Sequence, residues 1–190
     1  GAGLFGIGRP RLCNGANLAY RRASFDRIGG FAGHRNIASG DDEFLVQSIV
    51  YRQGGRVVFA TADKAIVRCR PSQSLGAFLA QRARWASKGL RYTDGRFRVF
   101  LVVLFAFFCA GTLMPLAAAQ SLEALAGAIA FFGAKAFLDA VILVLSARLF
   151  KVRFRWADWA VAELFHPFYL VTVSLLGTLC PYRWKGRTHR

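Results

Sequence analysis

Three long apolar segments in the second half of the chain restrict what it can fold into. The first covers residues 99–119 and carries no charge, which is enough helix, at about 1.5 Å per residue, to cross a hydrocarbon core of about 30 Å. The second covers 124–147, interrupted by Lys135 and Asp139, and the third covers about 159–181. We therefore expect residues 98–190 to form an α-helical transmembrane region with a basic tail.

Charge and apolarity separate along this chain. Lys and Arg total 26 against 10 Asp and Glu, a net charge of +16, and 55% of the residues are apolar. Such apolarity excludes intrinsic disorder. Most of the positive charge flanks the apolar segments, so the sequence favours membrane lipid over nucleic acid as a partner. The single Met is Met114 and the chain begins with Gly1, from which we expect a C-terminal portion of a longer protein.

Basic residues around the apolar segments predict their orientation. Positive charges cluster at 91–98 and 148–155, whereas 120–123 has none, so the positive-inside rule places the first two in the cytosol and the third outside. The tail after residue 182 is also basic, which conflicts with a simple third crossing. Either His166-Pro167 breaks the last segment into interfacial and re-entrant pieces, or the rule fails here.

The first half reads as alternating strands and helices. Strands are expected at 17–21, 56–61 and 65–70, and helices after Ser24, over 41–53 and after Ser74 as far as about Tyr92. This alternation predicts an α/β fold for residues 1–73. An amphipathic helix over 74–97 follows, and its basic face suits the membrane interface.

Two features of the first half carry possible chemistry. Ser39-Gly40-Asp41-Asp42-Glu43 places three carboxylates at a helix start, where they either cap the helix or supply a general base. Cys13-Asn14-Gly15 is a turn in which Gly15 permits close backbone approach. The four cysteines and three histidines show no metal-ligand spacing, so no metal site is expected in this chain.

Two further features lie after residue 73. Gln81, Arg82, Arg84 and Trp85 lie on the basic helix, where Arg84 contacts either lipid headgroups or a phosphate, for which its guanidinium is suited. Lys135 and Asp139 are spaced i,i+4, which favours a mutually neutralising pair facing other helices over a role in a substrate path.

Together these motifs resemble the family 2 glycosyltransferases, in particular the membrane-embedded branch that includes cellulose, chitin and hyaluronan synthases and bacterial envelope enzymes. The matching stretches are Cys-Asn-Gly-Ala-Asn at 13–17, Arg-Ile-Gly-Gly-Phe at 27–31, Gly-Asp-Asp-Glu-Phe-Leu at 40–45, Gln-Arg-Ala-Arg-Trp at 81–85 and the Trp-Lys-Gly-Arg tail at 184–187.

The resemblance implies an inverting, nucleotide-sugar-dependent transfer on a GT-A fold, making a polysaccharide or glycolipid. Asp42 would be the base, with Asp41 beside it in the motif. Arg84 would stabilise the departing diphosphate, and Gln81, Arg82 and Trp85 would help to form the diphosphate and acceptor site. Cys13, Asn14 and Gly15 would line the acceptor side.

The same resemblance implies a UDP-sugar donor, a saccharide or lipid-linked acceptor, and a bacterial inner membrane with the catalytic part facing the cytosol. The full-length enzyme would need Mg²⁺ or Mn²⁺, but the Asp-x-Asp ligands are absent and are expected upstream of Gly1. The chain alone would then be inactive. The alternative is a non-catalytic membrane anchor that binds anionic lipid or a partner protein.

Overall fold

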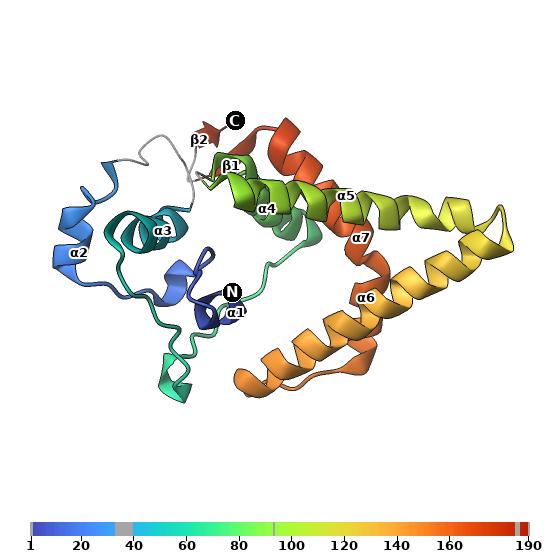
Figure 1. Ribbon diagram of the computed structural model, residues 1–190, viewed down its shortest axis with the longest axis horizontal. Helices are drawn as coiled ribbons and strands as arrows, with labels where there is room; N and C mark the ends of the chain where they lie inside the picture. Colours follow the sequence, from blue (N-terminus) through green and yellow to red (C-terminus); the bar gives the residue numbers. More distant parts are fainter. Residues whose placement is uncertain (1, 33–39, 93, 185–186, 190) are drawn as a thin grey trace. The chain divides into compact units, whose positions relative to one another are not determined.

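The computed structural model describes residues 2–32, 40–92, 94–184 and 187–189. These form two compact units that divide between Ser72 and Gln73. Each unit is described by itself below, with the element labels of Figure 1.

The first unit is organised around one helix. Its elements are α1 (Ala2–Gly6), the 3-10 turn η1 (Gly15–Asn17), α2 (Arg22–Arg27), α3 (Asp41–Gln53) and the 3-10 turn η3 (Asp63–Ala65). Seven consecutive residues of α3, from Glu43 to Ile49, are buried. Phe44, Leu45 and Val46 are each only 2% exposed, so α3 forms the apolar centre of this unit.

Local sequence explains where α3 begins and ends. Gly40 precedes it with φ +97° and Gly54 follows it with φ +63°, left-handed conformations that glycine adopts without steric cost. Gln53 is therefore the last helical residue, as predicted. Asp41 and Asp42 lie in the first turn, where negative charge is favourable at the positive end of the helix dipole. Ser39 lies outside the described residues.

The α/β expectation for residues 1–73 is wrong. No strand forms at 17–21, 56–61 or 65–70, and the sheet that the described residues contain is a two-stranded ribbon near the C-terminus, β1 (Tyr182–Trp184) with β2 (Arg187–His189). A strand is stabilised by hydrogen bonds to a neighbouring strand, and none is present beside these extended segments. Ser24 also lies inside α2 rather than capping it, since the helix begins after Arg21.

The second unit contains the long helices. They are α4 (Leu75–Ala86), the 3-10 turn η4 (Gly89–Arg91), α5 (Gly95–Ala118), α6 (Leu122–Leu149) and α7 (Trp156–Leu179). Ser74, Asp94 and Ser121 cap α4, α5 and α6 by accepting backbone N–H bonds. The amphipathic helix ends at Ala86 rather than near Tyr92, and η4 leads from it to α5.

Helices α5, α6 and α7 are each long and apolar enough to cross a membrane. Each helix begins two to four residues before the apolar segment read from the sequence; α6 also ends two residues later, whereas α5 ends one residue earlier and α7 two residues earlier. The third is one continuous helix with Pro167 inside it, so His166-Pro167 does not divide it. A proline in a long apolar helix is tolerated where neighbouring helices pack against it, and Pro167 is buried.

Close packing at glycines joins these helices. Helix α5 packs against both α6 and α7, and α4 packs against α7. A Cβ added at Gly111 would lie 3.0 Å from the Phe131 ring of α6 and 3.8 Å from Pro167 of α7. A Cβ added at Gly177 would lie 2.9 Å from the backbone N of Ser87 and closer still to the carbonyl O of Ala83. The backbones of α7 and α4 therefore touch at Gly177.

We predict that Gly177→Ala separates α4 from α7. The new methyl group meets backbone atoms, which cannot rotate away, and overpacking of this kind costs about 1–3 kcal/mol. Thermal unfolding in detergent should show a lower midpoint, and backbone amides of α4 should exchange faster with deuterium.

Gly133→Ala in α6 is the matched control, because nothing lies within 4 Å of its added Cβ and alanine favours a helix over glycine. Equal unfolding midpoints for the two variants would show that α4 and α7 do not touch at Gly177.

Candidate functional site

The structure brings the Cys13-Asn14-Gly15 turn to the start of α3. The backbone N–H of Gly15 donates to Asp42 Oδ2 at 2.8 Å. A Cβ at position 15 would lie 3.0 Å from the same oxygen, so the absence of a side chain permits this approach. Asp42 is half-buried, whereas Asp41 is exposed. Two separate motifs of the sequence thus meet at one carboxylate.

The turn is built by its own polar side chains. Asn14 Oδ1 accepts the N–H of Ala16 at 3.0 Å, which caps η1, and Asn17 Nδ2 donates to the carbonyl of Ala65 at 2.6 Å. Cys13 is half-buried at the beginning of the turn. The turn is therefore held on both sides while Gly15 faces the carboxylate.

Helix α3 also fixes the chain that leads into the turn. The buried Gln47 donates to the carbonyl of Arg11 at 2.9 Å, and the Tyr51 hydroxyl lies 3.3 Å from the carbonyl of Pro10. Asp42 Oδ1 accepts the N–H of Glu43 at 2.9 Å. A carboxylate oxygen offers two lone pairs, so Asp42 can still accept a proton from a bound hydroxyl.

The second group of predicted site residues lies on α4. The guanidinium of Arg82 stacks between two aromatic rings, 5.0 Å from the Phe78 centroid and 4.4 Å from the Trp85 centroid. Its Nε is buried with no hydrogen-bond partner among the described residues. Trp85 remains 42% exposed, so one part of its ring can meet a ligand.

Gln81 and Arg84 are half-buried near Trp85 on the same helix. The carbonyl of Arg84 accepts the Ser87 hydroxyl at 2.8 Å, where the helix ends. Phe78 also contacts Tyr169 of α7, with ring centroids 5.5 Å apart. The predicted residues of α4 are thus attached to the membrane helices through Phe78 and Gly177.

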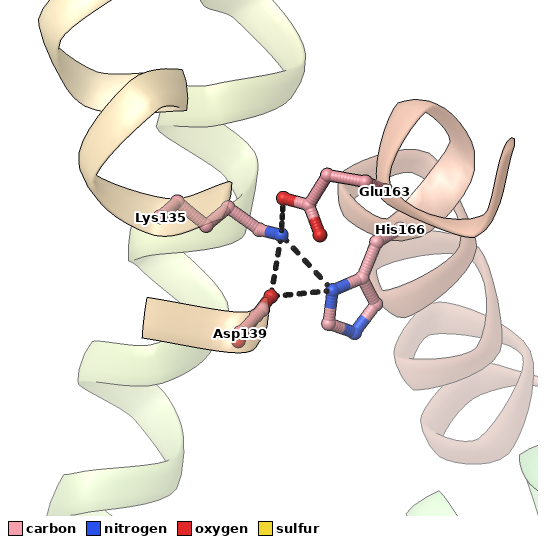
Figure 2. A network of polar contacts seen from close by, with 4 residues as sticks. All are labelled: Lys135, Asp139, Glu163 and His166. Carbon is pink, nitrogen blue, oxygen red and sulfur yellow. Dashed lines mark hydrogen bonds and ion pairs between the residues drawn. The ribbon is translucent and has the colours of Figure 1, made fainter. Parts of the chain in front are cut away.

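A third group, only partly foreseen, lies between α6 and α7 (Figure 2). Lys135 Nζ donates to Asp139 Oδ2 at 2.8 Å, as the i,i+4 spacing indicated, and also to Glu163 Oε1. His166 Nδ1 lies 3.1 Å from Lys135 Nζ and 3.4 Å from Asp139 Oδ2. Sequence reasoning missed Glu163 and the role of His166, although their own i,i+3 spacing in an apolar segment was a usable signal.

This network is also where three potential metal ligands converge. Oxygen or nitrogen atoms of Asp139, Glu163 and His166 lie within 4.8 Å of one another. The Lys135 ammonium occupies the space between them, and a positive group there opposes a metal ion. The donor set is therefore satisfied by Lys135 and does not fit a divalent cation.

The predicted residues fall in both compact units: Asp41, Asp42 and residues 13–15 in the first, and Gln81, Arg82, Arg84 and Trp85 in the second. Within the first unit the structure places a carboxylate against a glycine turn. Within the second it places a stacked guanidinium and an exposed indole on one helix. A carboxylate can act as a general base, and guanidinium groups can bind phosphate.

Comparison with known proteins assigns the family. Searches of curated proteins and of solved structures each found no match. The family model described as glycosyl transferase family group 2 matches residues 5–151, which is most of the chain and includes the Asp42 and Trp85 motifs. The chain therefore belongs to glycosyl transferase family group 2, and its role is glycosyl transfer.

Proposed function

We propose that the protein takes part in inverting transfer from a nucleotide sugar to an acceptor hydroxyl at a membrane, with Asp42 as the general base. The observation that carries this proposal is the hydrogen bond from Gly15 N–H to Asp42 Oδ2. It holds one carboxylate beside Gly15. Because glycine has no side chain, an acceptor can approach the backbone there. The three apolar helices support a membrane setting.

The proposed reaction is a displacement at the anomeric carbon of the donor sugar. Asp42 takes the proton of the acceptor hydroxyl, and the oxygen forms a bond to the anomeric carbon of the sugar. The bond from that carbon to the diphosphate oxygen breaks on the opposite face, and its electron pair leaves with the nucleoside diphosphate. Attack from the opposite face inverts the configuration. Asp41, exposed in the same turn of α3, adds negative charge beside the base.

In this proposal, residues of α4 bind the diphosphate of the donor. Arg84 stabilises the charge that develops on the diphosphate, and Gln81 and Trp85 contribute to the diphosphate and acceptor site. Arg82 stacks on Trp85 at 4.4 Å and so holds the indole in one orientation. Cys13, Asn14 and Gly15 line the acceptor side next to Asp42.

The family commonly uses a divalent metal. The group of three potential ligands among the described residues already surrounds the Lys135 ammonium, which opposes a metal ion there. No step of the proposed reaction is therefore assigned to a metal held by these residues.

Donor and product complete the proposal. We assign a UDP-sugar as donor and a saccharide or lipid-linked molecule as acceptor, giving a polysaccharide or glycolipid. The sequence contains no Asp-x-Asp motif, which supports the proposal that these 190 residues do not turn over donor by themselves. A bacterial inner membrane, with α3 and α4 on the cytosolic side where nucleotide sugars are found, is the proposed location.

Asp42→Asn should lower nucleoside diphosphate release by about 100-fold or more, the range expected when a general base is removed. Asparagine keeps an oxygen for the Gly15 N–H but cannot take the acceptor proton. The assay uses the full-length protein, not the 190 residues alone, in nanodiscs with UDP-sugars, membrane lipid and Mg²⁺ or Mn²⁺.

Asp26→Asn is the control for this variant, because among the described residues the Asp26 side chain forms an exposed surface pair with Arg22. Wild-type release from Asp42→Asn would remove Asp42 from the mechanism. Wild-type protein that released nothing from any donor would favour the membrane-anchor alternative.

Gly15→Ala tests the position of the Asp42 carboxylate without altering its chemistry. The added methyl lies 3.0 Å from Oδ2, so the carboxylate must move by a few tenths of an ångström. Because a 1 Å misplacement can cost about 100-fold, we expect turnover to fall about 3- to 10-fold. Gly6→Ala, which meets nothing within 4 Å, should retain wild-type turnover, and equal rates in the two variants would contradict the proposed geometry.

Arg84→Lys separates diphosphate recognition from lipid attraction. Lysine keeps the positive charge but loses the bidentate fork, so we expect about a tenfold loss of turnover with unchanged association with anionic vesicles. Arg96→Lys, an exposed residue at the beginning of α5, is the matched change. If both variants keep full turnover, Arg84 serves the membrane and not the diphosphate.

A further inference from the structure

In the charged network between the membrane helices α6 and α7, the cation is more buried than its partners. The Lys135 side chain is 4% exposed and Glu163 14%, whereas Asp139 and His166 are about one-third exposed. Figure 2 shows Lys135 and Asp139 on α6 facing Glu163 and His166 on α7. The network therefore connects α6 to α7, the next helix along the chain, through contacts between residues 28 and 31 positions apart.

The charges make this connection depend on the rotation of α7 about its own axis. An ammonium in an apolar bundle is costly unless carboxylates surround it, and here the partners come from both helices. Turning α7 about its axis would carry Glu163 and His166 away from Lys135 and leave the buried charge without its full set of partners. The network therefore fixes the rotation of α7 more strictly than apolar packing would, since apolar side chains tolerate small rotations.

The same helix continues from the network to α4. Glu163, His166, Val173 and Gly177 are separated by three, seven and four residues in turn, spacings that place them along one side of α7. Val173 is 3% exposed, and Gly177 touches the backbone of α4. One rotation of α7 thus satisfies both the charged network and the glycine contact.

Aromatic contacts run parallel to this helix face. The His166 ring lies 6.4 Å from the Tyr169 ring at an interplanar angle of 22°. Tyr169 then contacts Phe78 of α4 at 5.5 Å. Phe78 in turn carries the guanidinium of Arg82 at 5.0 Å, which stacks on Trp85. The contacts form a continuous path from the charged network to the indole.

We propose that Lys135, Asp139, Glu163 and His166 are positioning residues for glycosyl transfer. They hold α7 in the rotation that seats Tyr169 on Phe78 and so orients Arg82 and Trp85. This inference rests on the proposed function only for its catalytic consequence. The structural part, that the network determines the order of α4, can be tested without any substrate.

Lys135→Met tests the structural part. Methionine is similar in length and apolar, but it leaves the two carboxylates without their cation. In nanodiscs, amides of α4 within residues 75–86 should exchange with deuterium about fivefold faster than in wild type, because local opening costs less free energy. Arg148→Met is the control, since it removes a cation from the exposed end of the same helix.

Two further variants keep the test decisive if Lys135→Met does not fold. Glu163→Gln keeps the shape of its side chain and removes one charge across α6 and α7. Tyr169→Leu leaves the network intact and breaks the aromatic path at its centre. Both should raise exchange in α4, and Lys135→Arg, which keeps the charge, should restore part of the protection that Lys135→Met loses.

Kinetics test the catalytic part. Each network variant should lower kcat about tenfold with little change in KM for the nucleotide sugar, as expected when a transition-state contact is misplaced while donor binding is retained. Unchanged α4 exchange in Glu163→Gln and Tyr169→Leu would overturn the inference, whatever the activity. Faster exchange in a protein that transfers no sugar would refute the proposed function and leave the structural coupling standing.

Discussion

The contact between α7 and α4 at Gly177 is the constraint on which the second unit depends. Only a residue without a side chain lets the two backbones approach to the point where an added Cβ would lie 2.9 Å from Ser87 N. Helix α4 is amphipathic and short, and short helices are marginal without tertiary packing. Its order, and with it the position of Arg82 and Trp85, therefore derives from a membrane helix whose Gly177 lies 90 residues beyond Ser87 in sequence.

The same contact bears on membrane topology. The η4 turn after α4 adjoins the beginning of α5, where an added Cβ at Gly89 would lie 3.5 Å from Leu101. Helix α4 thus adjoins the first part of α5 and the last part of α7. The basic stretch at 91–98 thus lies near the last part of α7, and the basic stretch at 148–155 precedes the beginning of that helix. The two stretches that the positive-inside rule assigns to one side of the membrane therefore lie at opposite ends of α7.

Local signals foretold most of the helices. Apolar length predicted α5, α6 and α7, and Gly54 and Ser74 marked helix boundaries correctly. The strands failed because a β-branched extended segment becomes a strand only when another strand lies beside it. Residues 56–61 carry that local preference, but no described neighbour pairs with them. A strand forms only when two segments pair, and the sequence of one segment does not show whether a partner lies beside it.

In the candidate site, too, the sequence identified single residues but not the contacts between residues far apart in the chain. Residue types marked Asp42 and Gly15 separately, but their hydrogen bond joins positions 27 residues apart. Lys135 and Asp139 were paired correctly by helical spacing, whereas Glu163 required knowledge of which faces of α6 and α7 meet. The distant contacts in both places involve a charge that must find donors or a counter-ion. An ammonium withdrawn from water, as in Lys135, has few acceptable partners, and such a group therefore fixes a tertiary arrangement more specifically than the apolar residues around it.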